Sequence, residues 1–535
     1  MGAGSFIQVI LPLRLDWQPY YRCDAEVSPG QRVSLHFSGR RYSAVVYRTG
    51  VTPDVDVSRL RSIDAVENGL EPVTAGELRF WEFLASYYMC SLGEVYKAAC
   101  PEGKIKAELT GAAMLERLRT RLSLRRESLG KRHTQRVRER LEQECKELEI
   151  RIARLSGPAV SETPGQAASK PLLLAGGGRT EEYIALCRAA LEKGLNVLVL
   201  TPEIAAGAHL EKIFEAAFPG SVYGISSRLT PGMRRRITVD MRCSGGCIVV
   251  GTRISLFLPF CRLGLIIVDN EQDPLYKQSD PAPRYNARDA ALMLGRIHGA
   301  DVILGSPAPS LESCYNVASG KYGLRHTGAM LPEAEIVDIS AERRKNGMVG
   351  CLSRKLIRAA SGCAGPVALI RGWEKAEEVS EVCRSVLEGR HVDVLTVYEA
   401  MSGGLQDYAL VAVLQADALM SPDDFRADER AVQALAVLRE QCRGRFIVQT
   451  AKSEHPVFSS APECIYPKLM EERKAFQLPP YTRLVDEYRG GVQERHVLSP
   501  DAGLAGRKRR LYEDARSFER GNGGRVHVKF DVDPV

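Results

Sequence analysis

The 535-residue sequence has 14 cysteines but no Cys-x-x-Cys pair. Zinc fingers and ribbons hold their metal with such pairs at fixed spacing, so no zinc site is expected and the cysteines should be reduced thiols. No apolar run reaches the 18 residues that a membrane-spanning helix requires, and no basic region precedes a hydrophobic one at the start. These absences predict a cytoplasmic protein with no membrane attachment.

The overall charge balance indicates little. The formal net charge is only +7, while 44% hydrophobic and 26% charged residues are ordinary for a soluble chain of several domains. The distribution of charge is more informative, because thirteen lysines and arginines lie between residues 117 and 154. Leucines recur among them at spacings of three and four, which predicts two amphipathic helices broken near Gly130. The segment is either a solvated helical pair or a surface that contacts a phosphate backbone.

Two further segments are expected to lack regular structure. Residues 156–170 are rich in Gly, Pro, Ser and Ala, which predicts a linker between domains. Residues 490–524 are polar and basic, and this tail is expected to be partly disordered.

A glycine-rich loop stands between two apolar runs. The pattern predicts a strand ending at Leu174, then the loop, a helix over 180–193 and a second strand over 196–200. A loop in this position cradles phosphates with its backbone N–H groups in nucleotide-binding proteins. The nucleotide-binding candidates are Gly176, Gly177, Gly178, Arg179 and Thr180. An ordinary turn in a parallel sheet is the alternative interpretation of this segment taken alone.

The loop departs from the usual phosphate-binding pattern. Arg179 stands where a lysine reaches the terminal phosphates, and it keeps the charge without the compact ammonium geometry. Leu173 places a bulky side chain where the pattern begins with glycine. Thr180 retains the hydroxyl that would hold Mg²⁺. We therefore expect ATP to bind weakly or not at all.

A second buried strand is predicted over residues 263–269. It ends in Asp269, where the Mg²⁺-binding carboxylate of a nucleotide hydrolase belongs, so Asp269 and Thr180 are the candidate metal ligands. Asn270 and Glu271 complete the candidate catalytic motif. Asn270 stands where a glutamate activates the attacking water, and an amide cannot accept that proton.

Several segments resemble the primosomal protein N′ (PriA) family, the replication restart DNA helicases of bacteria. The strongest lie within residues 171–330 at matching spacing, and Gly264-Leu-Ile-Ile-Val-Asp-Asn-Glu-Gln-Asp273 is the clearest of them. Weaker similarity extends over 32–41, 81–88, 92–95, 424–430, 478–484 and 531–535.

The resemblance implies an α/β fold with two RecA-like helicase lobes, each a parallel sheet flanked by helices, preceded by a small β-rich N-terminal DNA-binding domain. The expected divisions are a 3′-end and fork-binding domain over 1–102, a basic helical region and linker over 103–170 that replaces the family's winged helix, a first lobe over 171–330, a shortened second lobe over 331–455 without the family's zinc insertion, and a C-terminal domain over 456–535.

The resemblance also shows that the arginine motif of the second lobe is altered. Counting on from Arg430, Gln441 and Gly444 stand where the family has arginines that stabilise the γ-phosphate. Arg443 and Arg445 could replace them only after a shift of register. Together with the exchanges at Arg179 and Asn270, three catalytic parts are changed.

The resemblance assigns DNA contacts to the first lobe and to the N-terminal domain. The candidates are Gly39, Arg40, Arg253, Tyr276, Lys277, Arg284, Tyr285 and Arg288. Tyrosines interleaved with basic residues suit base stacking and phosphate contact, although the tyrosines could equally pack on the lobe and Arg253 could brace the loop. Near the start, Trp17-Gln-Pro-Tyr-Tyr21 stands where the family has Phe-Asp-Tyr, so no acid is assigned to the 3′ hydroxyl.

Three functions remain open. The leading hypothesis is a replication restart protein that binds forked or single-stranded DNA and recruits primosome or helicase-loading proteins, with lost or weak ATPase activity. The alternatives are an active ATP-dependent 3′-to-5′ helicase, with ATP and Mg²⁺ as cofactors, and a protein-interaction module that does not bind DNA.

Overall fold

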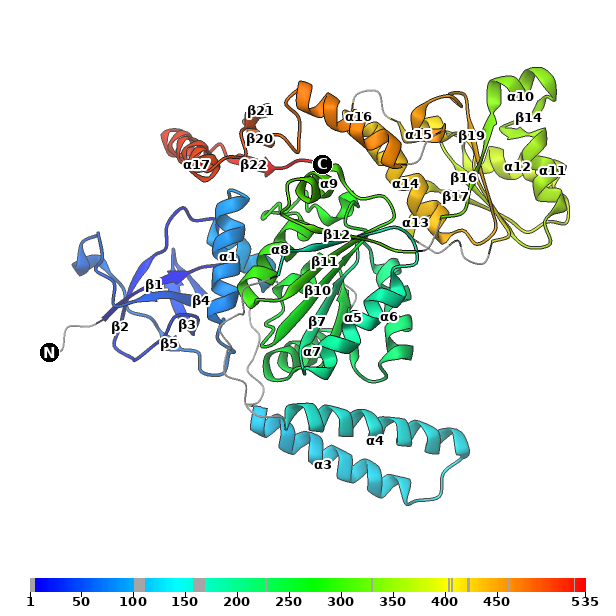
Figure 1. Ribbon diagram of the computed structural model, residues 1–535. Helices are drawn as coiled ribbons and strands as arrows, with labels where there is room; N and C mark the ends of the chain where they lie inside the picture. The colour runs from blue at the N-terminus through cyan, green and yellow to red at the C-terminus, as the bar shows by residue number, and fades with distance from the viewer. Residues whose placement is uncertain are drawn as a thin grey trace.

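The computed structural model describes residues 5–100, 111–156, 169–226, 229–328, 331–402, 405, 408–420, 424–459, 462–523 and 525–535. The linker predicted over 156–170 lies almost wholly outside these residues. Figure 1 shows a central parallel sheet with the N-terminal sheet on one side and a second parallel sheet on the other.

The N-terminal part is a five-stranded antiparallel sheet with strand order β2-β1-β4-β3-β5. Its strands are β1 (Ser5–Ile10), β2 (Tyr20–Cys23), β3 (Arg32–Phe37), β4 (Arg40–Thr49) and β5 (Ala65–Val66), with a short helix η1 (Val57–Arg59). Ser38 and Gly39 join β3 to β4 with φ angles of 47° and 79°, the left-handed pair that a two-residue hairpin turn requires.

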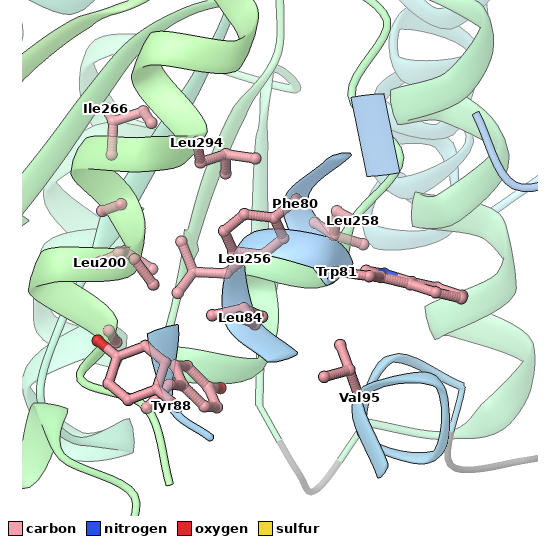
Figure 2. Packing of buried hydrophobic residues seen from close by; sticks show 14 of the residues in the cluster. Phe80, Trp81, Leu84, Tyr88, Val95, Leu200, Leu256, Leu258, Ile266 and Leu294 are labelled. Atoms are coloured by element: carbon pink, nitrogen blue, oxygen red, sulfur yellow. The ribbon is translucent and has the colours of Figure 1, made fainter. Parts of the chain in front are cut away.

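Two helices connect this sheet to the central one. Helix α1 (Ala75–Tyr87) and helix α2 (Leu92–Ala99) each begin with a capping box, in which a Ser or Thr and a Glu three residues later satisfy the first backbone N–H groups. Figure 2 shows that the buried face of α1 packs on the first lobe. The labelled side chains are Phe80, Trp81, Leu84, Tyr88 and Val95 on one side and Leu200, Leu256, Leu258, Ile266 and Leu294 on the other. At about 1.5–3 kcal/mol for each large buried side chain, this shared core fixes the two parts together.

Two long helices follow, as the leucine spacing predicted. They are α3 (Gly111–Leu129) and α4 (Gln135–Leu155), and they break at Gly130. Figure 1 shows them as an antiparallel pair below the first lobe.

The first lobe is a seven-stranded parallel sheet with order β12-β6-β11-β10-β7-β9-β8. Its strands are β6 (Leu172–Ala175), β7 (Asn196–Leu200), β8 (Val222–Ile225), β9 (Ile248–Gly251), β10 (Leu263–Asp269), β11 (Asp301–Ser306) and β12 (Gly323–His326). The helices are α5 (Thr180–Glu192), α6 (Ile204–Ala217), α7 (Pro231–Cys243), η2 (Arg253–Phe257), η3 (Pro274–Tyr276), α8 (Ala287–His298) and α9 (Leu311–Ala318). Strand β11 lies between β6 and β10, so the loops after all three strands meet at one edge of the sheet, where ligands bind in open parallel sheets.

The second lobe has a five-stranded parallel sheet with order β13-β19-β18-β16-β17. Its strands are β13 (Ala334–Asp338), β16 (Val367–Arg371), β17 (Val392–Thr396), β18 (Leu410–Val413) and β19 (Arg445–Thr450), with a small hairpin of β14 (Met348–Val349) and β15 (Leu352–Ser353). The helices are α10 (Ile339–Lys345), α11 (Arg354–Gly362), α12 (Ala376–Val386), α13 (Val397–Ser402), η4 (Ala416–Leu419), α14 (Ala427–Gln441), α15 (Pro456–Ser459) and α16 (Pro462–Ala475). The predicted fold class, two RecA-like lobes after a β-rich domain, is confirmed.

The C-terminal part corrects one expectation. Residues expected to be partly disordered form an antiparallel sheet, order β21-β20-β22, and a long helix. These elements are β20 (Arg483–Arg489), β21 (Val492–Leu498), α17 (Leu504–Gly521) and β22 (Val528–Val532). The polar and basic composition suggested disorder, but basic side chains of α17 are paired within the fold. Lys508 lies 3.5 Å from the centre of the Tyr87 ring, and Arg516 pairs with Glu519 and Asp16. None of the helices in the described ranges is long and apolar enough to span a bilayer.

Candidate nucleotide cleft and DNA-binding surfaces

The glycine-rich loop has the geometry of a phosphate-binding turn. Strand β6 ends at Ala175, and Gly176 and Gly178 follow with φ angles of 114° and 67°, which only glycine adopts without strain. The Gly176 N–H donates to the carbonyl of Ser306 at 2.9 Å, which ties the loop to the end of β11. Helix α5 begins at Thr180, so its positive end faces the loop.

Arg179 is the centre of this site. Its side chain is only 4% exposed, and its guanidinium donates to Asp269 Oδ1 at 3.1 Å, to Asn270 Oδ1 at 3.2 Å and to the Gly176 carbonyl at 2.7 Å. Burial alone would lower the pKa of Arg179, but Tyr183, Asp269 and Glu440 raise it above its ordinary value. The arginine is therefore a permanently charged group held inside the cleft.

The counter-charge comes from the second lobe. Glu440, in the last turn of α14, accepts hydrogen bonds from Arg179 Nη1 at 2.9 Å and from the Gly178 N–H at 3.2 Å. A backbone N–H of a glycine-rich loop and an adjacent cation are the groups that hold a phosphate oxygen in nucleotide-binding proteins. The carboxylate of Glu440 thus occupies the place of an anion in this loop and joins the two lobes.

The metal-binding acid is engaged in the same way. Asp269 Oδ1 accepts from the hydroxyl of Tyr183 at 2.8 Å as well as from Arg179. Asn270 follows in the left-handed region with φ of 52° and directs its amide oxygen to Arg179. The Gly178 N–H and the side chains of Arg179, Asp269 and Asn270 are therefore all bonded to protein side chains. As placed, these residues do not fit Mg²⁺-ATP.

Glu271, the third residue of the predicted catalytic motif, is bound inside the first lobe. It is buried and accepts from the Ser310 N–H at 2.7 Å, from the Ser310 hydroxyl at 2.9 Å and from Arg288 at 3.1 Å. Its acceptor atoms are occupied, so it does not replace the missing water-activating glutamate.

One of the two arginines that a register shift could supply, Arg445, does not reach the loop. Arg445 pairs with Glu335 at 2.7 Å on the surface of the second lobe. Gln441, at the family's arginine position, donates to the Met401 carbonyl at 3.0 Å within that lobe. Glu440, one residue earlier, is the member of the altered motif that enters the cleft.

Sequence reasoning missed Glu440 and also Glu429, which ties the lobes a second time. Glu429 on α14 accepts from the Leu311 N–H of the first lobe at 2.9 Å and pairs with Arg473. Arg426, on the same segment, pairs with Glu312 at 2.8 Å. The segment 424–430 was recognised by resemblance, but the direction of its side chains is not readable from the sequence.

The predicted DNA-contact tyrosines of the first lobe are buried. Tyr276 has no exposed surface, and its hydroxyl donates to the Leu200 and Asp269 carbonyls at 2.8 and 2.6 Å. Tyr285 is 1% exposed and donates to the Arg253 carbonyl. These rings cannot stack on bases in this arrangement, which favours the packing interpretation of the segment.

The basic side chains of the same segment are also engaged. Arg253 Nη1 donates to the carbonyls of Leu275 and Lys277 at 2.9 and 2.7 Å, so it braces the loop. Lys277 pairs with Asp531 of the C-terminal part at 2.7 Å. Arg284 pairs with Asp280 at 2.7 Å, and Arg288 is held by Glu271.

The N-terminal sheet offers an open groove instead. A cavity of about 650 Å³ lies between the loop after β1, the β3–β4 turn and the segment around η1, and is lined by Asp16, Trp17, Tyr20, His36, Phe37, Ser38, Arg59 and Arg61, among others. Trp17 is 54% exposed, and its ring centroid lies 6.4 Å from that of Phe37. Gly39 and Arg40 are exposed on the adjoining turn. Exposed aromatic rings beside arginines suit a nucleotide base and its phosphate.

Asp16 is an acid in this groove that the motif comparison overlooked. The triplet Leu15-Asp16-Trp17 has the apolar, acidic, aromatic order of Phe-Asp-Tyr, and it ends at Trp17, the first residue of the stretch 17–21. Arg516 of α17 holds Asp16 at 3.1 Å.

These features define a class: two RecA-like lobes that face each other across a modified phosphate loop, preceded by a small DNA-binding domain. Residues 8–101 match the family model described as the 3′ DNA-binding domain of PriA. Replication restart protein PriA of Rickettsia prowazekii is 30% identical over 351 residues, which is 63% of this chain and 48% of that protein. PriA of Chlamydia pneumoniae is 33% identical over 42% of this chain and 31% of that protein, and PriA of Haemophilus influenzae is 41% identical over 28% and 20%.

The N-terminal domain matches the PriA 3′ DNA-binding domain, and 63% of the chain is similar to a PriA protein. The chain spans about half the length of curated relatives such as the PriA proteins of two Rickettsia species. Among solved structures, RecG bound to a three-way DNA junction covers 82% of this chain and 56% of its own, with 13% identity and a TM-score of 0.40.

Proposed function

We propose that this chain is a PriA-type replication restart protein that binds branched DNA by a 3′ end and does not hydrolyse ATP. Support for DNA binding comes from the match of residues 8–101 to a 3′ DNA-binding domain and from the exposed groove of that domain. The observation that carries the loss of hydrolysis is the carboxylate of Glu440 on the phosphate loop.

In this proposal the groove holds the last nucleotide of a strand. The base lies against Trp17, since stacking on an exposed aromatic ring is worth about 1–3 kcal/mol and tolerates any base. Arg59 and Arg61 stand at the rim, where they offer charge to the phosphate. Asp16 accepts a hydrogen bond from the 3′ hydroxyl, and a strand that continues past this point has no hydroxyl to donate.

The lobes act in this proposal as a scaffold. A motor opens and closes as nucleotide binds and leaves, but here Glu440 and Arg179 supply both charges from the protein itself. The absence of a water-activating residue at Asn270 fits the same conclusion. Recognition of the fork, followed by recruitment of primosome or helicase-loading proteins, is the function that such a scaffold serves.

The test compares forks that differ only at the 3′ end of the nascent strand. We expect the purified chain to bind a fork with a 3′ hydroxyl at least tenfold more tightly than one with a 3′ phosphate, as measured by fluorescence anisotropy. Asp16→Asn should reduce this preference, whereas Asp54→Asn, on the lining of the same groove, should retain it. Equal affinity of the wild-type chain for both forks would contradict the assignment of the groove.

A further inference from the structure

The pair of helices α3 and α4 carries the charge of the molecule unevenly. Residues 115–140 contain ten lysines and arginines and three acids, a net charge of +7 that equals the formal net charge of the whole chain. The next part of α4, residues 142–149, holds four glutamates and one lysine. The basic part, residues 115–140, includes most of α3, all of the turn and the first six residues of α4, and we call it the basic hairpin.

The acidic part of α4 belongs to the anchored end of the pair. Arg151 pairs with Asp240 of α7 at 2.7 Å, and both side chains are buried. Tyr223 donates to the other oxygen of Asp240 at 2.7 Å, and Arg154 donates to the Gly220 carbonyl at 3.1 Å. One end of α4 is therefore fixed on the first lobe, and in Figure 1 the opposite end leads into the turn, which faces away from the N-terminal sheet.

Some of the hairpin charges are already paired. Arg125 binds Glu144 at 2.9 Å, and Arg126 binds Glu149 at 2.8 Å, so these arginines join the two helices. In contrast, five exposed arginines of the hairpin make no ion pair with any residue that the structure describes: Arg117, Arg119, Arg121, Arg132 and Arg136. Arg117 and Arg121 are four residues apart in α3 and so lie on one face, while Arg132 and Arg136 lie at the turn. Free charge is left on the surface after the internal pairs are made.

The composition of the segment distinguishes among nucleic-acid partners. Proteins that bind single strands stack bases on aromatic side chains, but residues 101–160 contain no Phe, Tyr or Trp. Arginines without neighbouring aromatic residues suit the phosphate backbone of a duplex, whose charge density is high and regular. Helix α3, most of which lies in the basic hairpin, has 19 residues and is about 28 Å long, somewhat less than one turn of B-form DNA.

We propose that the basic hairpin binds the backbone of a DNA duplex, as a second DNA site separate from the groove of the N-terminal sheet. This proposal rests on the proposed function in one respect: a branched DNA has both a 3′ end for the groove and a duplex arm for the hairpin. The large apolar side chains exposed on the hairpin are Leu124 and Val137, fewer than its exposed arginines, so an apolar protein partner has less to bind than a duplex has.

The experiment measures binding of the full chain to a dumbbell duplex of about 30 base pairs, closed at both ends by loops and therefore without a 3′ end. The test variant replaces Arg117, Arg121, Arg132 and Arg136 with Gln. The control variant makes the same change of charge on the second lobe, at the exposed Arg343, Arg344, Arg354 and Arg358. A third variant, with Lys at the four hairpin positions, keeps the charges that phosphates bind.

Each phosphate contact adds about 0.9 to the slope of log affinity against log salt. If two of the four arginines contact phosphates, the Gln variant should lose about 60-fold in affinity at 0.1 M salt, with a slope smaller by about 1.8. The Lys and second-lobe variants should bind as the wild type does. Circular dichroism of the Gln variant should match that of the wild type, because the replaced side chains are exposed.

Unchanged dumbbell affinity in the Gln variant would overturn the proposal, and so would an equal loss in the second-lobe variant or a wild-type chain that does not bind the dumbbell. The dumbbell has no 3′ end, so none of these results depends on the preference for a 3′ hydroxyl, which is measured separately on forks. A failure of the hairpin proposal can therefore be told from a failure of the groove.

Discussion

Replacement of Glu440 tests the internal ion pair that closes the cleft. Loss of one partner of a fully buried pair costs about 3–5 kcal/mol, because the other charge is left without compensation. Glu440 keeps 21% of its side-chain surface exposed, and Arg179 retains Asp269, so we expect a smaller effect of about 2 kcal/mol for Glu440→Ala. At 1.4 kcal/mol for each factor of ten, the ratio of closed to open lobes should fall about 30-fold.

The hydrogen bond from Gly178 gives a local measurement of this opening. Its N–H donates to Glu440, so its exchange with solvent reports the separation of the lobes. Mass spectrometry of the peptide containing Gly178 should show exchange about 30-fold faster in Glu440→Ala than in the wild type. Glu472→Ala, an exposed change on α16, is the control and should leave the rate unchanged.

A double-mutant cycle makes the pairing explicit. Arg179→Ala and Glu440→Ala should each destabilise the chain to urea, and the double variant should be more stable than the sum of the two effects predicts, by about 2 kcal/mol. Additive effects, or a Gly178 exchange rate that does not respond to Glu440→Ala, would refute the account of the cleft.

Three further predictions concern the groove, the buried tyrosines and pH. Trp17→Ala should weaken binding of forks with a free 3′ end by about 1–3 kcal/mol in anisotropy titrations, and an equal loss on the dumbbell duplex would count against a role at the 3′ end. Tyr276→Phe removes a buried hydroxyl with two carbonyl partners and should lower stability to urea by about 1–3 kcal/mol without changing DNA affinity; unchanged stability with weaker DNA binding would instead mean that the hydroxyl contacts DNA. Burial, with a smaller effect of Arg79, lowers the pKa of His298 to about 4, below its ordinary value of 6.5. The unfolded chain therefore binds a proton that the folded chain does not between these values, so stability should fall by at most about 3 kcal/mol as pH drops from 6.5 to 4. His298→Gln should remove this part of the pH dependence in thermal unfolding, and an unchanged pH profile would refute it.

The first lobe could be predicted from its sequence because its signals are local. The apolar runs that end at Leu174 and Asp269 and the glycines between β6 and α5 describe strands and a turn without reference to distant residues. The helical pair α3 and α4 was predicted for the same reason, from leucines at spacings of three and four.

The contents of the cleft could not be predicted in this way. Glu440 and Arg179 are 261 positions apart, and their contact depends on which face of α14 meets the first lobe. Tyr276 and Tyr285 suggested an exposed loop because prolines and charges surround them, but both side chains turn inward to bond backbone carbonyls. In the C-terminal part, the basic residues of α17 suggested disorder because their partners, such as Tyr87 and Asp16, lie in the N-terminal part.

ATP hydrolysis in the presence of forked DNA tests the central claim most directly. The purified chain should bind the fork at low salt and, in the same sample with excess Mg²⁺-ATP, release phosphate no faster than a sample without protein. A fork-stimulated release of phosphate that disappears in Arg179→Ala would contradict the account, because it would mean that ATP displaces Glu440 and that the cleft still works as a motor.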